Sequence, residues 1–105
     1  MRNVRTGVIA LKAAKDTAGQ SILIHQSCNI DTLCVHNGIS IIDGFVTHGG
    51  FKNIKKEAIK IYEKTPYNYL LLYSPSLISD DVKEFKEMVH ELENFYGIYV
   101  KQVRP

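Results

Sequence analysis

The sequence predicts an α/β fold, with an α+β arrangement as the alternative. From Ile39 to Val103, apolar runs typical of strands alternate with helical patterns, which is the order of a parallel βαβαβ unit. Asn37-Gly38 lies between two pairs of strand-forming residues and predicts a tight hairpin, so the N-terminal strands are expected to be antiparallel. Together these observations predict a mixed sheet of about five to six strands with two main helices. The length of 105 residues suits a single domain over residues 1–105.

Composition and charge are those of an ordinary folded protein. Hydrophobic residues make up 45% of the chain and charged residues 23%, which excludes a disordered tail or a fibrous repeat. The net charge of +2 is modest for a nucleic-acid-binding protein, which usually presents a clustered basic face. Nucleic acid is therefore not expected as a partner.

The sequence shows no sign of membrane insertion or secretion. No apolar run approaches the roughly 18 to 20 residues that a membrane-spanning helix needs. Lys12 and Lys15 interrupt the N-terminal apolar segment before the core of a signal peptide can form. The two cysteines, Cys28 and Cys34, suit a reducing compartment. We therefore expect a soluble, cytoplasmic protein without membrane association, and no motif calls for a cofactor.

The first third of the chain predicts short strands. Val4 to Ala14 is ambiguous, because Gly7 to Ile9 favours a strand whereas Ala10 to Lys15 contains good helix formers. A strand is the preferred interpretation there. Ser21 to Ser27 and Thr32 to His36 are predicted as the next two strands.

The fourth predicted strand runs from Ile39 to Val46 and is interrupted by Asp43-Gly44. That dipeptide predicts either a β-bulge or a second tight turn, and both alternatives stay open.

Two amphipathic helices are predicted in the second half. Phe51 to Lys64 places apolar residues on one stripe, and Pro66 prevents the helix from continuing. The second helix is expected to begin near Ser79, whose hydroxyl can cap it, and to end at Gly97. Its predicted apolar stripe consists of Val82, Phe85, Val89, Leu92 and Tyr96.

Two further strands complete the pattern. Tyr69 to Tyr73 shows no alternation of apolar and polar residues, which is expected when helices cover both faces, so it is predicted as the central parallel strand. Ile98 to Val103 alternates and predicts a half-exposed edge strand. Antiparallel strands followed by αβαβ resemble ribonuclease-H-like folds in topology. The metal-dependent chemistry implied by that resemblance needs carboxylates on strands, but the first two predicted strands contain no Asp or Glu, which disfavours a nuclease.

Polar residues gather where predicted strands end. In open α/β sheets, ligands bind beyond the carboxyl ends of parallel strands, next to helix N-termini. The helix from Phe51 has no Ser, Thr or Asp cap and begins with lysines, so an anion beside Gly49-Gly50 would stabilise it. A small anionic ligand there is one hypothesis, and the preferred interpretation is a tight strand-to-helix turn with solvated lysines. The candidate ligand-binding residues are His48, Gly49, Gly50, Lys52, Ser74, Ser76 and Arg104.

A second cluster contains residue types that bind zinc. The spacing of its members matches no usual zinc knuckle, so a metal site is the weaker hypothesis, and buried cysteines with surface histidines are the preferred interpretation. No family signature of a cysteine nucleophile surrounds either thiol. The cluster consists of His25, Cys28, Cys34 and His36.

The two predicted helices carry opposite charge, with lysines dominating the first and carboxylates the second. Such helices either pack against each other within the chain or meet across a subunit boundary, where charge complementarity sets orientation. The six tyrosines favour the second alternative if they are exposed, because Tyr is enriched in recognition surfaces.

These observations favour a small binding or assembly module that acts through protein–protein contacts, with a protein partner or with copies of itself. The reason is that 105 residues leave little material for a closed active site. The alternative is a small enzyme or sensor that binds a phosphate-bearing ligand at the loops Thr47–Gly50 and Ser74–Ser76. In that case His48 would be the general acid-base, while no other catalytic residue is identified.

Overall fold

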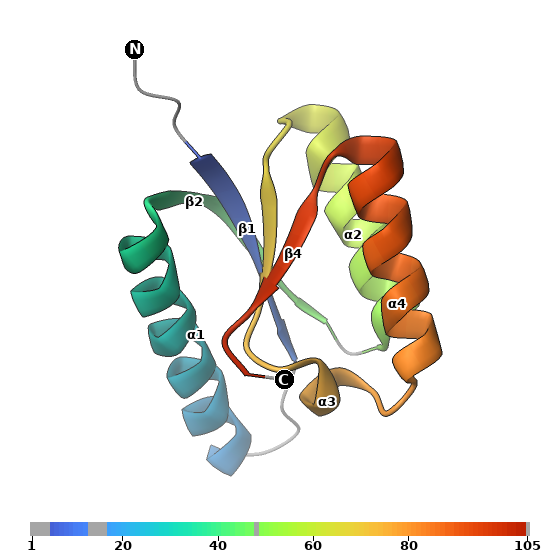
Figure 1. Ribbon diagram of the computed structural model, residues 1–105. Helices are drawn as coiled ribbons and strands as arrows, with labels where there is room; N and C mark the ends of the chain where they lie inside the picture. Colours follow the sequence, from blue (N-terminus) through green and yellow to red (C-terminus); the bar gives the residue numbers. More distant parts are fainter. Residues whose placement is uncertain (1–4, 13–16, 48, 105) are drawn as a thin grey trace.

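The computed structural model describes residues 5–12, 17–47 and 49–104. In these segments, strands and helices alternate along the chain (Figure 1). The elements are, in order, β1 (Arg5–Lys12), α1 (Thr17–Asn37), β2 (Ile39–Thr47), α2 (Phe51–Lys64), β3 (Tyr69–Leu72), α3 (Pro75–Ile78), α4 (Val82–Glu91), the π-helical turn η1 (Leu92–Tyr96) and β4 (Tyr99–Gln102).

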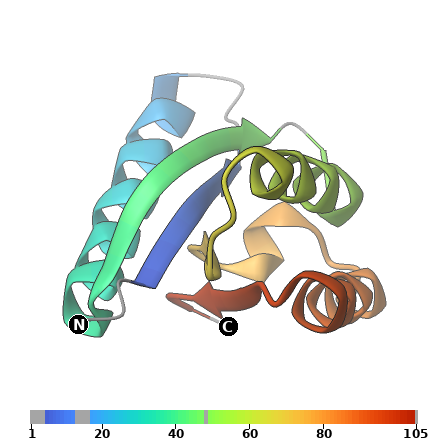
Figure 2. The ribbon, with the colours of Figure 1, turned by 90° about the horizontal axis from the view of Figure 1, so that it is seen from above.

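The strands form one parallel sheet between two layers of helix. The strand order is β2-β1-β3-β4, and every neighbouring pair is parallel. Helix α1 covers one face, and helices α2 and α4 cover the other (Figures 1 and 2). Within the described segments, no helix combines the length and hydropathy needed to span a bilayer.

The predicted antiparallel hairpin and the mixed sheet of five to six strands are wrong. The segments predicted as strands, Ser21 to Ser27 and Thr32 to His36, belong to the single helix α1. Asn37-Gly38 ends this helix instead of turning a hairpin: Gly38 has φ of 65°, and Asn37 Nδ2 donates to the carbonyl of Leu33 at 2.7 Å. Positive φ suits a helix C-terminus as well as a type I′ turn, so the dipeptide could not distinguish the two. The topological resemblance to ribonuclease-H-like folds disappears with the antiparallel strands.

The preferred interpretation of the first segment as a strand is confirmed over β1, which occupies an inner position in the sheet. Asp43-Gly44 follows a bulge in β2 and forms no second turn. Gly7 pairs with Ile41 whereas Val8 pairs with Asp43, so Ile42 is the extra residue.

The second half of the chain follows its predicted order. Helix α2 has the predicted bounds, and β3 lies between β1 and β4, parallel to both, as the unbroken apolar run indicated. The next helix, α4, begins at Val82, later than predicted. Phe85 and Leu92 of the predicted stripe pack in the core beside Met88, which the stripe lacked, whereas Val82 is exposed.

Two apolar clusters hold the sheet between its helices. Successive residues of β3 point to opposite faces, so Leu70 and Leu72 pack towards α2 and α4 whereas Leu71 packs towards α1. All three are fully buried, which explains the absence of alternation in this strand. The α1 cluster contains Ile9, Ile30, Cys34, Ile39 and Leu71.

Candidate functional site

The carboxyl ends of the four parallel strands lie along one edge of the sheet, where the sequence predicted a site. The strand order reverses direction between β1 and β3, and ligands of open α/β sheets bind at such a switch point. Lys12 ends β1 on one side of this point, and Ser74 follows β3 on the other.

The loop after β2 is held by contacts within the chain. Lys12 Nζ donates to the carbonyl of Gly49 at 3.2 Å, and the Gly49 amide donates to Thr47 Oγ1 at 3.2 Å. A Cβ on Gly49 would overlap the side-chain amide of Asn53, which would have to move aside. His48, the candidate acid-base, lies outside the described residues.

The N-terminus of α2 has an internal anion beside it. Gly50 is the N-cap residue and offers no side chain, which leaves amides of the first turn without an intrahelical acceptor. The backbone amide of Lys52 donates to Glu84 Oε1, a carboxylate of α4, at 3.1 Å. A carboxylate of the same chain therefore occupies a position at which the sequence predicted a bound anion.

Glu84 can cap α2 because Ser79 accepts the hydrogen bond that a glutamate at this position usually accepts within its own helix. Asp81 and Glu84 have the spacing of a capping box, in which the glutamate would bond the amide of its own N-cap residue. Here Asp81 Oδ1 accepts from the Glu84 amide at 2.9 Å, but the Asp81 amide donates to Ser79 Oγ at 3.1 Å. The side chain of Glu84 therefore extends to the neighbouring helix.

The other predicted ligand-binding residues lie after β3 and β4. Ser74 is buried, and its hydroxyl is 2.9 Å from that of Ser76, which is exposed. The amide of Arg104 donates to the carbonyl of Tyr73 at 2.8 Å, so Arg104 and Ser74 lie on adjacent backbone segments. The structure thus brings Ser74, Ser76 and Arg104 together. Strand β1 separates this group from the loop after β2.

The candidate zinc ligands lie on α1 and not on paired strands. Cys34 and His36 were expected to share a face as alternate strand residues, but two positions apart on a helix they point in different directions. Cys34 is buried against the sheet, and Cys28 is exposed. Burial and, secondarily, the neighbouring Asp31 raise the pKa of the Cys34 thiol, which disfavours a reactive thiolate. The side chain of His25 lies outside the described part of the chain. Among the described residues, no three His, Cys, Asp or Glu side chains converge to hold a metal ion.

The oppositely charged helices pack against each other within one chain. Lys55 Nζ of α2 forms an ion pair with Glu91 Oε2 of α4 at 2.9 Å, besides the contact of Glu84 with α2. Tyrosines strengthen the same layer, since the ring of Tyr62 packs edge-on against those of Tyr67 and Tyr96. The packing of the two helices within one chain therefore accounts for their opposite charges, and no subunit boundary is needed to explain them.

A different surface stands out at the free edge of β2. This strand is nine residues long, lies at the end of the sheet and pairs only with β1 among the described strands. Three of its apolar side chains are exposed, Ile41 at 38%, Ile42 at 41% and Val46 at 49%. A long, apolar edge strand is a template for pairing with another chain unless it is protected.

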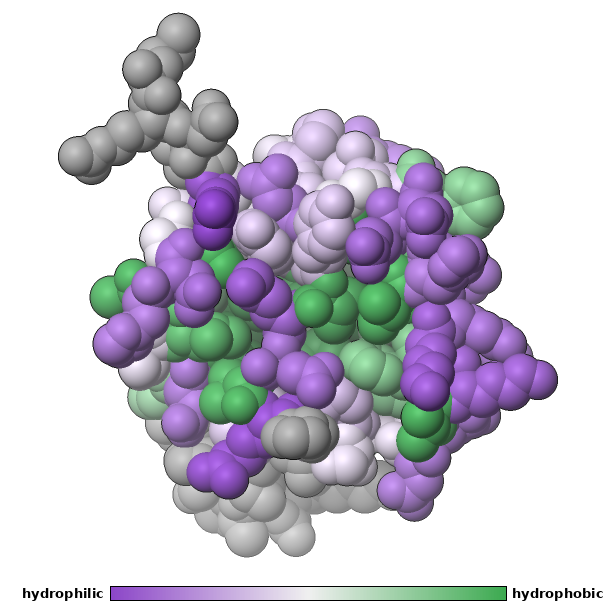
Figure 3. All heavy atoms as spheres, viewed as in Figure 1, coloured by the Kyte–Doolittle hydropathy of each residue, from purple (hydrophilic) through white to green (hydrophobic). Residues whose placement is uncertain are grey.

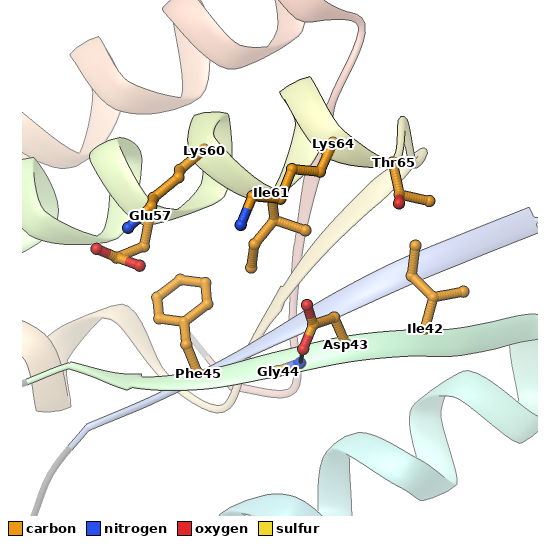
Figure 4. A pocket seen from close by; sticks show the side chains of 9 residues that line it. All are labelled: Ile42, Asp43, Gly44, Phe45, Glu57, Lys60, Ile61, Lys64 and Thr65. Carbon is orange, nitrogen blue, oxygen red and sulfur yellow. Dashed lines mark hydrogen bonds between the residues drawn. The ribbon is translucent and has the colours of Figure 1, made fainter.

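Next to this edge lies a groove of about 360 Å³ between β2 and α2, which we call the β2 groove (Figure 4). Ile42 and Phe45 of the strand and Ile61 of the helix supply its apolar side chains. Two acidic and two basic side chains line it as well, and no ion pair within the described residues joins any of them. The lining residues are Ile42, Asp43, Gly44, Phe45, Glu57, Lys60, Ile61, Lys64 and Thr65.

Sequence reasoning missed this surface because it placed more strands before β2. The available signal was Asp43-Gly44: a charge and a bulge inside an apolar strand are typical of sheet edges.

Comparison with known proteins identifies the fold. No protein-family model matches the chain, and no curated protein matches its sequence. Among solved structures, the chain is similar to the C-terminal catalytic domain of ISC1926 TnpA, an IS607-like serine recombinase. The TM-score is 0.71, the sequence identity is 14%, and the match covers 95% of this chain and 70% of the recombinase chain. At this identity the likeness shows a shared α/β fold with a parallel sheet.

This likeness corrects the expectation that nucleic acid is an unlikely partner. That expectation relied on the modest net charge of +2. Because the same fold serves as the catalytic domain of a recombinase, the modest charge of the chain is no ground for calling nucleic acid unlikely.

Proposed function

We propose that the protein is an assembly module that self-associates through the free edge of β2. The observation behind this proposal is the nine-residue edge strand with exposed Ile41, Ile42 and Val46. Pairing with another strand would satisfy its outward-facing backbone groups and remove these side chains from water, and both effects favour association.

The opposite edge of the sheet differs from β2. Strand β4 has four residues, and its Lys101 ammonium lies over the ring of Tyr69 at 5.3 Å from the centroid. Figure 3 views this side of the molecule and shows hydrophilic side chains interspersed with apolar ones. A short edge strand with a lysine is a protected edge, so β2 is the better candidate for strand pairing.

Recombinase chemistry is less well supported than assembly. A serine nucleophile needs a neighbouring base or another activating group. In the described part of the chain, Ser76 Oγ pairs with another hydroxyl and Ser79 Oγ accepts from a backbone amide, and neither partner is a base. Assembly through β2 requires no such group.

Mass photometry and light scattering over a range of protein concentrations test the proposal. We expect a concentration-dependent dimer in the wild-type protein and a monomer in Ile42→Lys, which places a charge on the edge. Phe95→Lys is the matched control, because Phe95 is also exposed but lies in η1, which contacts β4 at the opposite edge of the sheet. A wild-type protein that stays monomeric at high concentration, or that binds labelled duplex DNA as a monomer, would overturn assembly as the function.

A second candidate function is the binding of a phosphate-bearing ligand by a small enzyme or sensor. The observation in its favour is that Ser74, Ser76 and Arg104 gather beside the switch point between β1 and β3. Isothermal titration with inorganic phosphate and nucleotides tests it. Binding that is lost in Ser76→Ala and His48→Ala would support this function, and the absence of heat at millimolar ligand would exclude it.

A further inference from the structure

We infer that the partner at β2 is a second copy of this chain, paired antiparallel about a two-fold axis, with Asp43 of each copy facing Lys64 of the other. This inference rests on the proposed self-association. It adds the relative direction of the two β2 strands and the charged residues that pair across the interface.

The charges of the β2 groove favour a second copy over an unrelated partner. A two-fold interface brings the same patch of both subunits together, so the patch must complement itself. The groove carries Asp43 and Glu57 beside Lys60 and Lys64, and within the described residues none of the four is in an ion pair. A partner that carries one sign of charge could form ion pairs with only two of these four side chains, whereas a second copy offers charges of both signs.

The arrangement of the groove assigns the cross-pairs. Glu57 and Lys60 are three residues apart on α2 and therefore lie close enough to screen each other. Asp43 and Lys64 remain, one on the strand side of the groove and one on the helix side (Figure 4). Asp43 accepts a hydrogen bond from the Gly44 amide at 2.8 Å, which leaves acceptor capacity on its carboxylate.

An antiparallel pairing of the two β2 strands lets these groups meet. A two-fold axis perpendicular to the sheet continues the sheet across the interface and keeps both α2 helices on the same face. Each groove then opens towards the β2 strand of the other copy. Lys64 of one α2 extends across the new strand pair towards Asp43 of the other copy, and the symmetry repeats the contact.

This geometry predicts a distinctive result in mixed samples. In Asp43→Lys every copy places lysine against Lys64, and in Lys64→Glu every copy places glutamate against Asp43, so each variant alone contains two like-charge pairs. In a heterodimer of the two variants, the new lysine meets the new glutamate, and the unchanged Lys64 meets the unchanged Asp43. Both cross-pairs are then attractive.

The experiment measures dimer formation by each variant alone and by an equimolar mixture, with circular dichroism as a check of folding. We expect dimerisation of each variant to weaken about tenfold or more, and the mixture to form heterodimers with near wild-type affinity. The control mixes Asp43→Lys with Lys86→Glu, which changes an exposed lysine on the outer side of α4. The heterodimer of this mixture keeps one like-charge pair, so its affinity should stay below that of the wild type.

A second measurement applies if a charge reversal impairs folding. Asp43→Asn keeps the size and the acceptor oxygen of Asp43, and it should remove most of the salt dependence of wild-type dimerisation. Absence of rescue in the mixture, or unchanged salt dependence in Asp43→Asn, overturns the assigned pairing; if Ile42→Lys still disrupts the dimer, self-association through β2 stands. A monomeric wild-type protein overturns both proposals.

Discussion

Glu84 of α4 accepts a hydrogen bond from the backbone amide of Lys52 at the start of α2, with 3.1 Å between Oε1 and the nitrogen. One helix therefore caps its neighbour, and the Lys55–Glu91 ion pair joins the same two helices further along. The cap satisfies an amide that glycine at the N-cap position leaves without a side-chain acceptor, and it places negative charge at the positive end of the helix dipole.

Glu84→Ala tests the energetic role of this cap. Removal of the carboxylate leaves the first turn of α2 to water, so we expect the free energy of unfolding to fall by about 1 kcal/mol. Urea denaturation measures the change. Glu87→Ala is the matched control, because Glu87 is an exposed carboxylate on the same helix, and it should change stability by less than about 0.5 kcal/mol. Equal effects of the two substitutions would show that the cap contributes nothing beyond surface charge.

Gly38→Ala tests the assignment of Asn37-Gly38 as a helix end. A Cβ at Gly38 would meet no atom within 4 Å, so the only cost is the backbone φ of 65°. We expect a loss of about 1 kcal/mol in the free energy of unfolding, and a smaller loss for Gly38→Asn, since asparagine tolerates the left-handed region. Thermal unfolding followed by circular dichroism measures both. Full stability in Gly38→Ala would contradict the left-handed conformation of this residue.

Local signals in the sequence were enough to predict α2, β3 and β4. Helix α2 has a regular apolar stripe and a proline beyond its end, and β3 is an unbroken apolar run between turn residues. Helix α1 was missed because Ile22, Leu23 and Ile24 are consecutive and typical of a strand. Among the α1 residues whose side chains are described, Ile30 and Cys34 have helical spacing and are both buried against the sheet.

The candidate sites depend on relationships that local patterns do not contain. The charge of α4 was visible in the sequence, but Glu84 lies 32 residues from Lys52, and only the packing of α4 beside α2 brings them together. Similarly, β2 is an edge strand because of the order in which four strands assemble. Its apolar residues alone cannot distinguish an edge from a buried position.

Gly7→Ala tests the close packing in the middle of the sheet. A Cβ at this position of β1 would lie 2.7 Å from Leu71 Cδ1 and 2.9 Å from Ile39 Cγ2, which are both buried side chains of the α1 cluster. We expect a loss of about 1 to 3 kcal/mol in the free energy of unfolding, because these side chains must leave their preferred positions.

A double-mutant cycle with Leu71→Val identifies the cause of that loss. Valine lacks the terminal methyl group nearest to the new Cβ, so the double variant should lose less stability than the sum of the two single changes. Additive losses in urea denaturation would mean that the clash with Leu71 is not the source of the effect.

Tyr67 makes the stability of the domain depend on alkaline pH. Its hydroxyl is buried and donates to the carbonyl of Ala58 at 2.7 Å, and burial raises the pKa of this hydroxyl above its ordinary value of 10.0. Above about pH 10 the unfolded chain releases the Tyr67 proton while the folded protein retains it, so the free energy of unfolding falls as the pH rises. The slope from this group approaches about 1.4 kcal/mol per pH unit.

Tyr67→Phe should lose about 1 kcal/mol of unfolding free energy at pH 7 through the missing hydrogen bond but should show a shallower decline between pH 10 and 11. Urea denaturation of both proteins at several pH values isolates the contribution of Tyr67, because all other titrating groups are common to the two, and parallel pH profiles would rule it out.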